Sequence, residues 1–353
     1  MKGYIANEYI KVPEDLKLRD DLPEPTCPPN GAAGISFASL MVLQGKYQFK
    51  PKLPMRPGAD VAGIILEVGP NCPKQFYVGQ RVFCGGEIAE RTAVIPTEET
   101  FEVPASLTMA EAAAIGVNYT TSWIGLVNRG RVAKDEVVLV HSGAGGIGSS
   151  SIQIAKHLGA YVIATVSSDD KIPVCKTAGA DAVLNYATDK EWPEKVKEIT
   201  RNIPGREREG ADIVVDPTGL IIPSTKCTAW NGRLLVVGFT GGKIEQIPAN
   251  RLLLKNVAAI GVNINGYKKS FGQTTVTEPG VLDDAWRGLF QMFTEGRAPD
   301  GQPPKPILYH EKFEGLESLP LALRASSMNR ASFGKIMITF GPPEVLVPRS
   351  SHL

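Results

Sequence analysis

The residues whose types and spacing most directly suggest chemistry are four glycines in one short run, Ser142-Gly-Ala-Gly-Gly-Ile-Gly148. Because glycine has no side chain, the backbone here can turn sharply and a ligand can approach its amides closely. Unpaired amides at the start of a helix, together with the helix dipole, suit a pyrophosphate. The run therefore indicates a dinucleotide site, with a tight packing turn as the alternative. The candidate contacts are Ser142, Gly143, Gly145, Gly146, Ile147 and Gly148.

The flanking residues predict the elements that would position this turn. Residues 137–140 are a continuous apolar run, which is typical of a strand buried on both faces. After the glycines, apolar residues recur at helical spacing as far as Leu158, and Gly159 stands where a helix would end. The local prediction is a strand, a tight turn and a helix.

The same alternation continues beyond this unit. Further buried strands are predicted at 160–166, 182–184, 212–215, 234–238 and 258–262, and helical stretches near 171–178, 192–201 and 220–229. Strands that alternate with helices over about 140 residues predict an α/β fold with a parallel, doubly wound sheet. In such a sheet the glycine turn admits a dinucleotide.

The residues after the second strand bear on which dinucleotide binds. NAD-binding sheets carry an acidic residue there, whereas this chain has Ser167 and Ser168, followed by Lys171. Small hydroxyls and a lysine suit the 2′-phosphate of NADPH, so we expect NADPH as the cofactor. Asp169 and Asp170 oppose this interpretation unless they cap the next helix. The alternative for Lys171 is an exposed helix lysine.

Composition excludes several classes of function. The chain has 353 residues, enough for two domains, and its net charge is +1, from 38 basic and 37 acidic residues. No basic stripe indicates a nucleic-acid partner, and no apolar run is long enough to span a membrane. The five cysteines are scattered and odd in number, which favours reduced thiols inside a cell.

Several motifs along the chain, taken together with the glycine run, resemble those of a known family. The segments 45–47, 57–69, 78–82 and 112–121 resemble the medium-chain dehydrogenase/reductase superfamily. The segments 142–148, 167–168, 185–186, 216–217, 232–239 and 334–335 resemble its zinc-free quinone oxidoreductase (zeta-crystallin-like) branch. The resemblance implies a GroES-like β-barrel catalytic domain from residues 1–120 plus 265–345. A Rossmann cofactor domain, 121–264, would be inserted in it, and a flexible tail, 346–353, would follow.

The resemblance also implies roles for individual residues. The nicotinamide and substrate end would be lined by Tyr47, Asn118 and Thr121, and the cofactor would also meet Gly238, Phe239 and Asn263. Tyr186 and Lys335 would approach the phosphates. The alternatives are packing or loop polarity for Tyr47 and Thr121, and a solvated charge for Lys335.

The zinc ligands of the superfamily are missing from this sequence. The zinc enzymes have a cysteine soon after a Gly-Ile pair, but here Ile35 is followed by Ser36. Their Gly-His-Glu is replaced by Gly58-Ala-Asp60, and only Cys84 stands where several structural cysteines would be needed. A tetrahedral zinc site needs several converging Cys or His ligands. We therefore expect no metal.

Two departures concern the barrel. The branch has a valine-rich strand before the segment 31–35, but here Asn30 runs directly into Gly31. A barrel without that strand would expose edges, unless another segment takes its place. In addition, Ser36 and Ser39 stand where the branch has Asn and Asp, which bears on the polarity of the substrate pocket.

Without a metal, the expected reaction is hydride transfer to an acceptor that is already electrophilic, a quinone or an α,β-unsaturated carbonyl. A hydroxyl must stabilise the developing oxyanion, and Tyr47 is the candidate that orients or protonates it. The alternatives are a 2-enoyl-thioester reductase and a catalytically weak, NADPH-binding crystallin-like protein.

Two expectations concern assembly and destination. The family resemblance implies a homodimer, and the apolar last strand, 257–262, which would leave an unprotected edge if alone, agrees with this expectation. The final residues, Ser351-His352-Leu353, resemble the address read by the peroxisomal import receptor. The alternative is a cytoplasmic protein whose segment 346–349 is a thrombin-type cleavage sequence left by cloning.

Overall fold

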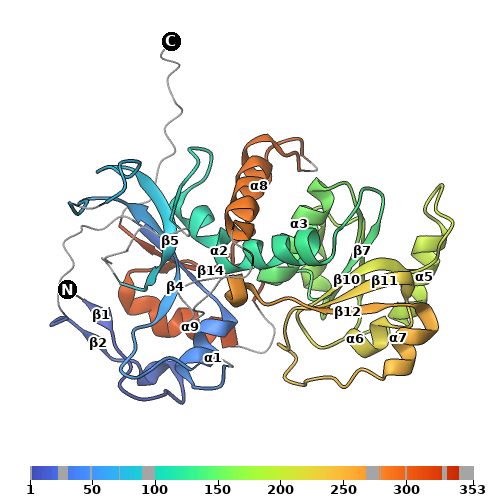
Figure 1. The fold of residues 1–353 in the computed structure, drawn as a ribbon. Helices are drawn as coiled ribbons and strands as arrows, with labels where there is room; N and C mark the ends of the chain where they lie inside the picture. Colours follow the sequence, from blue (N-terminus) through green and yellow to red (C-terminus); the bar gives the residue numbers. More distant parts are fainter. Residues whose placement is uncertain are drawn as a thin grey trace, which may run out of the picture. The chain divides into compact units, whose positions relative to one another are not determined.

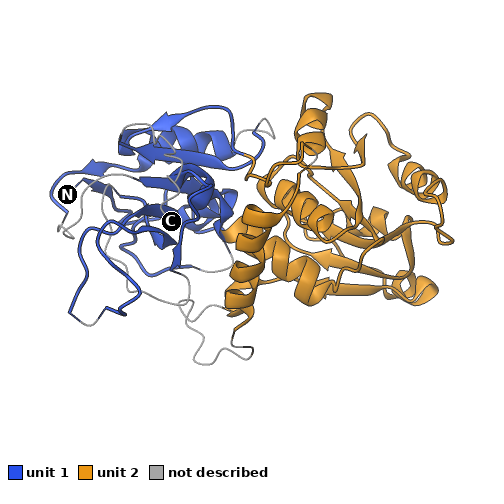
Figure 2. Cartoon of the chain, turned by 90° about the horizontal axis from the view of Figure 1, so that it is seen from above, with its two compact units in different colours: residues 1–116, 308–353 blue, residues 117–307 orange. Residues whose placement is uncertain are grey.

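The computed structural model describes residues 2–22, 31–47, 50–70, 72–89, 100–267, 278, 280–298, 300–327 and 332–341. The chain forms two compact units, coloured separately in Figure 2. Unit 1 comprises Met1–Gly116 and Leu308–Leu353, and unit 2 comprises Val117–Ile307. Helix α2 (Met109–Trp123) contains the boundary, and its backbone leaves helical geometry at Gly116.

Unit 1 is built on a six-stranded sheet, of which β4, β5 and β14 are labelled in Figure 1. Its order is β13-β14-β3-β4-β5-β6, antiparallel except for the parallel pair β13 and β14. The strands are β3 (Gly31–Ile35), β4 (Gly58–Ile64), β5 (Arg81–Glu87), β6 (Phe101–Glu102), β13 (Phe313–Glu314) and β14 (Ile336–Phe340). The last strand of the chain, β14, thus pairs with β3, which lies before unit 2 in the sequence.

The shortened start of the barrel does not leave β3 as an edge. Among the described residues, β3 pairs with β14 on one side and with β4 on the other. Residues 23–30, where the family strand would begin, lie outside the described residues. The C-terminal strand β14 therefore covers the side of β3 that we expected to be exposed.

Helices and short elements pack against this sheet and form an apolar core with it. Helices α1 (Phe37–Leu43) and α9 (Leu319–Ser327) contribute Leu40, Leu43, Leu319 and Leu323, which are all buried. The smaller elements are β1 (Gly3–Tyr4), β2 (Leu18–Arg19), η1 (Pro13–Asp15) and η6 (Leu316–Ser318).

Unit 2 contains the predicted parallel sheet, and the predicted α/β fold is confirmed. The order is β12-β11-β10-β7-β8-β9, with every neighbouring pair parallel. The strands are β7 (Val137–Val140), β8 (Tyr161–Val166), β9 (Ala182–Asn185), β10 (Ala211–Asp216), β11 (Thr228–Val236) and β12 (Ala258–Gly261). The strand order reverses between β7 and β10, and doubly wound sheets bind ligands beyond the carboxyl ends at such a point.

Besides the end of α2, unit 2 contains short and long helices within the described residues. They are η2 (Ile124–Arg129), α3 (Gly146–His157), η3 (Asp169–Lys171), α4 (Ile172–Thr177), α5 (Trp192–Arg201), α6 (Ile221–Ser224), α7 (Ala249–Lys255), η4 (Ile264–Tyr267) and α8 (Val281–Glu295). None of the helices in the described ranges combines the length and apolar composition needed to cross a bilayer.

One predicted helix is wrong in extent. The stretch near 220–229 contains only the four-residue helix α6, and β11 already begins at Thr228. Thr228 pairs with Ala211 of β10, and the register then shifts. Asn231 adopts a left-handed conformation, with φ of 59°. Pairing with β10, and not the local helical pattern, therefore determines that this segment is a strand.

Helix α8 belongs with unit 2, whereas the sequence assigned residues 265–345 to the catalytic domain. A Cβ at Gly288 would clash with the ring of Trp123, so α8 packs directly on α2. The ring of Phe293 also meets that of Tyr119 edge-on, with centroids 5.2 Å apart. These two contacts join α8 to α2, and the Gln153 side chain donates to the Lys305 carbonyl oxygen at 2.9 Å, which keeps the chain after α8 in unit 2 as well.

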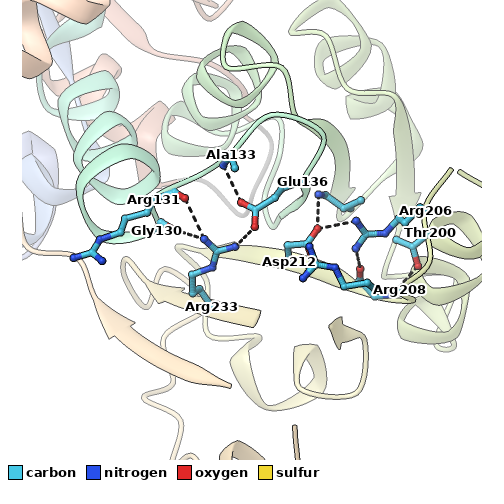
Figure 3. Close-up of polar contacts among 11 residues, drawn as sticks. Gly130, Arg131, Ala133, Glu136, Thr200, Arg206, Arg208, Asp212 and Arg233 are labelled. Atoms are coloured by element: carbon cyan, nitrogen blue, oxygen red, sulfur yellow. Dashed lines mark hydrogen bonds and ion pairs between the residues drawn. The ribbon is translucent and has the colours of Figure 1, made fainter. Parts of the chain in front are cut away.

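One buried and one half-buried ion pair join the amino ends of the central strands (Figure 3). Asp212 of β10 accepts a hydrogen bond from the Val137 amide of β7 and forms an ion pair with Arg206, each at 2.8 Å. Arg233 of β11 pairs with Glu136 and donates to the carbonyl oxygen of Gly130. These contacts lie at the end of the sheet opposite to the carboxyl ends, so they stabilise the sheet that carries the site.

Candidate functional site

The glycine run lies at the carboxyl end of β7, between that strand and α3, as the sequence predicted. Ser142 adopts a left-handed conformation with φ of 52°, and the Gly145 amide donates to its carbonyl oxygen at 2.9 Å. The Gly143 amide donates to the Thr165 oxygen of β8, also at 2.9 Å. These bonds fix a tight turn at the point where the strand order reverses.

Internal packing accounts for some of these glycines but not for all. A Cβ at Gly143 would lie 2.8 Å from Cys175 Sγ, and one at Gly148 would clash with the Ser142 carbonyl oxygen. At Gly145 the nearest atoms belong only to Ser142, at 3.2 and 3.3 Å. Gly145 is also the N-cap of α3, and no side chain caps this helix among the described residues. The turn thus leaves an uncapped helix N-terminus beside a backbone that a ligand can approach.

Asn118 and Gly146, both predicted site residues, are neighbours. A Cβ at Gly146 would clash with the side-chain amide of Asn118, so glycine there makes room for that buried amide. Serine hydroxyls hold α2 against α3: the Oγ atoms of Ser122 and Ser150 are 2.7 Å apart, and Ser151 donates to Ser122 at 2.9 Å. Hydrogen bonds between the helices therefore position Asn118 at the glycine run.

Thr121 carries a buried hydroxyl for which the described residues supply no hydrogen-bond partner. The residue is 5% exposed, and its Oγ1 has no hydrogen bond within the described part of the chain. A buried hydroxyl without a partner costs about 1–3 kcal/mol. This cost is expected where a ligand completes the bond, and packing alone gives no reason for a hydroxyl at this position.

At the end of β8 the candidate residues are partly buried. Ser167 and Ser168 are half-buried, and Ser168 does not cap the turn that follows. Asp169 accepts a hydrogen bond from the Asn185 side chain at 2.8 Å. Lys171 is only 7% exposed, so it is not the exposed helix lysine of the alternative.

Lys171 and Tyr186 border the apolar interior of unit 2. Burial raises the pKa of the Cys175 thiol to about 12, although the nearby charge of Lys171 opposes this shift. Tyr186 follows β9 and packs against the core. Contact of either residue with a 2′-phosphate stays a prediction.

The predicted nicotinamide residues follow β11 and β12. The Gly238 amide donates to the Asp216 carbonyl oxygen at 3.4 Å, and Phe239 is half-buried. Asn263 is exposed, and its Oδ1 accepts the Asn265 amide at 3.1 Å. Asn263 borders a cavity of about 230 Å³. The residues that line it are Arg129, Gly261, Asn263, Gly266, Tyr267 and Glu278.

Two predicted site residues belong to unit 1. Tyr47 follows α1, its amide donates to the Met41 carbonyl oxygen at 3.1 Å, and its side chain is half-buried. Lys335 is 3% exposed, and its Nζ donates to Asp60 Oδ2 at 3.1 Å. It is therefore not the solvated charge of the alternative. Gly116 provides room for Asp60, because a Cβ there would clash with that carboxylate.

The positions at which zinc ligands would stand have other roles. Ser36 is the N-cap of α1, and its side chain accepts the Ser39 amide at 3.1 Å. Burial, with a smaller contribution from the charge of Asp60, raises the pKa of Cys84 to about 12, which disfavours the thiolate that zinc requires. The described residues contain no group of three His, Cys, Asp or Glu side chains arranged to hold a metal. The prediction of a metal-free chain rests on the sequence.

Sequence reasoning missed three polar residues beside the glycine run. His141 directly precedes it and is fully buried, with its ring nitrogens 2.8 Å from Thr165 Oγ1 and 2.7 Å from Ser224 Oγ. Burial lowers the pKa of His141, which favours the neutral ring. The other two are Asp216 and Glu245, whose carboxylates bind backbone amides near the carboxyl end of β10. The only signal in the sequence was the Asp216-Pro217 pair of the family motif.

Two family models match the chain, one for each kind of domain. Residues 30–105 match the alcohol dehydrogenase GroES-like domain, and residues 146–277 match the family described as zinc-binding dehydrogenase. The GroES-like assignment made from the sequence is thereby confirmed.

Relatives that match about three quarters of the chain carry the name quinone oxidoreductase-like protein 2. The chain is 35% identical over 272 residues to the quinone oxidoreductase-like protein 2 homolog of Nematostella vectensis, which covers 75% of this chain and 70% of that protein. It is 34% identical over 281 residues to quinone oxidoreductase-like protein 2 of Bos taurus, covering 76% and 77%.

Solved structures agree with these relatives. The Escherichia coli quinone oxidoreductase complexed with NADPH has a TM-score of 0.77 at 25% identity, covering 96% of this chain and 100% of that chain. The quinone oxidoreductase of Thermus thermophilus, also solved with NADPH, has a TM-score of 0.75 at 25% identity, with the same coverage. The resemblance stated from the sequence is confirmed: this chain belongs to the quinone oxidoreductase branch of the medium-chain dehydrogenase/reductase superfamily.

Proposed function

We propose that this chain is an NADPH-dependent oxidoreductase that transfers hydride to a quinone or an α,β-unsaturated carbonyl without a metal. The observation that carries the proposal is the glycine run at the strand-order reversal. Gly145 is half-buried there, a Cβ on it would meet only Ser142, and the N-terminus of α3 has no capping side chain among the described residues. An anion can bind these amides without displacing a protein group.

The residues present fit a dinucleotide. The glycine run would hold the pyrophosphate, while Ser167, Ser168, Lys171 and Tyr186 would hold the adenosine ribose and its 2′-phosphate. Gly238, Phe239 and Asn263 would contact the nicotinamide end, and Lys335 would contribute a second cation to the phosphates. The quinone oxidoreductases of Escherichia coli and Thermus thermophilus were solved with NADPH, which supports this choice over NADH. When bound, NADPH supplies the hydride.

The chain's own residues would orient the reactants and manage the proton. The Thr121 hydroxyl, which has no partner among the described residues, and the Asn118 amide are available to hydrogen-bond the carboxamide or the acceptor. Tyr47 would donate a hydrogen bond to the acceptor oxygen, where negative charge develops. The absence of a metal is argued from Ser36 and Ala59, which stand where the zinc enzymes have cysteine and histidine.

We further propose that the chain is a homodimer formed through the β12 edge of unit 2. Ala258, Ala259 and Gly261 of that strand are exposed. Nearby in sequence on α7, Leu253 is 80% and Leu254 is 71% exposed. An apolar edge strand without cover is a site for strand pairing. A second copy would cover it by an isologous contact.

The peroxisomal destination is also a proposal. Ser351, His352 and Leu353 lie outside the described residues, so only their sequence supports it. Fusing the last ten residues to a fluorescent reporter tests it. Puncta that coincide with a peroxisomal marker are expected, and a diffuse signal would contradict the proposal.

The activity is tested by following NADPH oxidation with quinones, enals and enoyl thioesters, with NADH in parallel. We expect turnover with quinones or enals, a preference for NADPH, and no loss after chelation. A preference for thioesters would favour the enoyl-thioester alternative. NADPH binding without turnover of any acceptor would favour the crystallin-like alternative. In this assay Tyr47→Phe should lower kcat and leave the Kd for NADPH nearly unchanged.

A further inference from the structure

Two carboxylates bind five consecutive backbone amides at the carboxyl end of β10. Asp216 accepts the amides of Thr218 at 2.7 Å and of Gly219 at 3.0 Å, and also that of Leu220. Glu245, from the loop after β11, accepts the amides of residues 221 and 222 at 2.6 and 3.2 Å. We call Asp216, Glu245 and the amides of residues 218–222 the carboxylate clamp.

The clamp joins two loops that are remote in sequence. The loop after β10 is also bonded to the loop after β11 through its carbonyl oxygens. Pro217 accepts both the amide and the hydroxyl of Thr240 at 3.0 Å, and Thr218 accepts the Gly241 amide at 3.0 Å. A Cβ at Gly241 would lie 2.5 Å from that Thr218 oxygen, so the two backbones are in direct contact. The loop after β11 therefore follows the conformation that the clamp imposes on the loop after β10.

Gly238 and Phe239 are held within this pair of loops. The Asp216 carbonyl oxygen accepts the Val237 amide at 3.0 Å and the Gly238 amide at 3.4 Å. Phe239 thus lies between Gly238, whose amide donates to Asp216, and Thr240, whose amide and hydroxyl donate to Pro217. These bonds restrict the backbone of Phe239 on both sides.

The location connects the clamp to the cofactor. β10 lies directly beside β7, and the strand order reverses between them. Ligands of doubly wound sheets bind beyond the carboxyl ends at this reversal. The glycine run follows β7, while the clamp begins at Asp216, the last residue of β10. The clamp therefore borders the side of the site opposite to β8, where the adenosine 2′-phosphate is expected.

The clamp occupies the amides of residues 218–222, so these amides cannot bind a phosphate and the glycine run remains the anion site. Amides that are bound by carboxylates have no capacity left for a phosphate. Asp216 is 1% exposed, and burial, with a smaller contribution from the charge of Asp216, raises the pKa of Glu245. Two acidic groups near the carboxyl end of β10 disfavour a phosphate on that side and permit the uncharged or cationic nicotinamide ring.

We propose that Asp216 and Glu245 are positioning residues, which fix Gly238 and Phe239 against the nicotinamide end of the dinucleotide and exclude its phosphates from that end. This inference rests on the proposed function. Neither carboxylate exchanges a proton with the reactants. Their effect is on the orientation of the bound cofactor, where a displacement of about 1 Å can reduce the rate about 100-fold.

The test compares Glu245→Ala with Glu245→Gln. The glutamine oxygen can still accept the two amides, whereas alanine removes the acceptor. We expect Glu245→Ala to lower kcat/KM at least tenfold, mostly in kcat, and to raise the Kd for NADPH less than threefold. Glu245→Gln should remain within threefold of the wild type. If Glu245→Ala proves insoluble, Asp216→Asn replaces it, with the same expected division between kcat and Kd. Asp216 uses both oxygens, Oδ1 for Thr218 and Oδ2 for Leu220, so the single oxygen of asparagine cannot replace it.

Two readouts do not depend on turnover. Hydrogen exchange of residues 218–222 should be faster in Glu245→Ala, and NADPH should protect residues 237–241 less than in the wild type. The fluorescence of bound NADPH should also change, since it reports the environment of the nicotinamide. Asp181→Ala is the matched control, because Asp181 accepts the Val162 amide at 2.7 Å in the same unit. It should lower the melting temperature but leave kcat/KM and NADPH fluorescence unchanged.

The outcomes separate the two proposals. A wild type that fails to bind NADPH would refute the proposed function, and the clamp's role with it. Normal NADPH binding, with kcat/KM of Glu245→Ala within twofold of the wild type, would refute the clamp alone. An equal loss in Glu245→Ala and Asp181→Ala would also refute it, since both would then act through stability.

Discussion

Removing the carboxylate of Asp212 should destabilise unit 2 more than any single surface ion pair could. The side chain of Asp212 is 2% exposed and that of Arg206 is 7% exposed, so the pair is buried (Figure 3). In Asp212→Ala the Arg206 guanidinium would stay buried without its counter-ion, which costs about 3–5 kcal/mol. The Val137 amide would also lose its acceptor, a loss of about 1–3 kcal/mol.

These two losses share one carboxylate, so they are not additive. Arg206 keeps its hydrogen bond to the Gly210 carbonyl oxygen at 2.7 Å, which limits the loss. Arg206 Nε and Asp212 Oδ1 have no hydrogen-bond partner among the described residues, so the pair is incompletely satisfied. We therefore expect a loss of about 4 kcal/mol. For a unit of this size it corresponds to a fall in Tm of about 8–16 °C.

Tryptophan fluorescence measures this change in the relevant unit. All four tryptophans, at positions 123, 192, 230 and 286, belong to unit 2. Thermal and urea unfolding followed by this signal therefore report unit 2 whatever unit 1 does. Urea is preferred to guanidinium because it does not screen the charges under test.

Two further variants test whether the buried, unpaired charge of Arg206 causes this loss of stability. Arg208→Ala removes a cation that is 3.6 Å from Asp212 but 55% exposed, so its effect should stay below about 1 kcal/mol. Adding Arg206→Met to Asp212→Ala removes the unpaired charge, so the double variant should be more stable than Asp212→Ala alone. A loss below about 1 kcal/mol in Asp212→Ala, or a double variant that is less stable still, would refute this account.

Four other predictions concern the site and the assembly. Thr121→Val removes a buried hydroxyl that has no partner among the described residues, so it should leave Tm unchanged or higher while kcat/KM falls, and a lower Tm would contradict the assignment. Gly145→Ala should raise the Kd for NADPH while the protein stays folded, whereas Gly148→Ala should lower Tm through its clash with the preceding turn; calorimetry and circular dichroism separate the two. Lys171→Ala should weaken NADPH and spare NADH in parallel titrations, and equal weakening would reassign this buried lysine to packing. Leu254→Glu should shift light scattering from the dimer mass to the monomer mass, and an unchanged mass would remove this face from the interface.

The sheet of unit 2 was predictable because its strands are buried on both faces and are therefore apolar throughout. The run 137–140 coincides with β7, and 182–184 lacks only the last residue of β9. The beginning of β11 could not be found in this way. Its first part contains exposed residues such as Trp230 and Asn231, and pairing with β10 keeps it in the sheet.

The glycine run was predictable because the strand before it, the glycines of the turn and the helix after it are consecutive in the sequence. Thr121 could be named only through the family resemblance, and its lack of a partner among the described residues emerges from packing in three dimensions. The short distance between Asn118 and Gly146 likewise depends on the contact of α2 with α3.

Strand β10 shows why the remaining part of the site required the fold. Asp212 is its second residue and Asp216 its last, and both carboxylates are buried and accept backbone amides. In the sequence they are two identical residues, four positions apart. In a parallel sheet, however, the direction of the strand places one at the amino ends and the other at the carboxyl ends, where ligands bind. Hence Asp212→Ala should act on Tm, whereas Asp216→Asn should act on kcat at temperatures at which both variants are folded. If both variants changed Tm alone, the position along the strand would not distinguish structural from functional carboxylates in this protein.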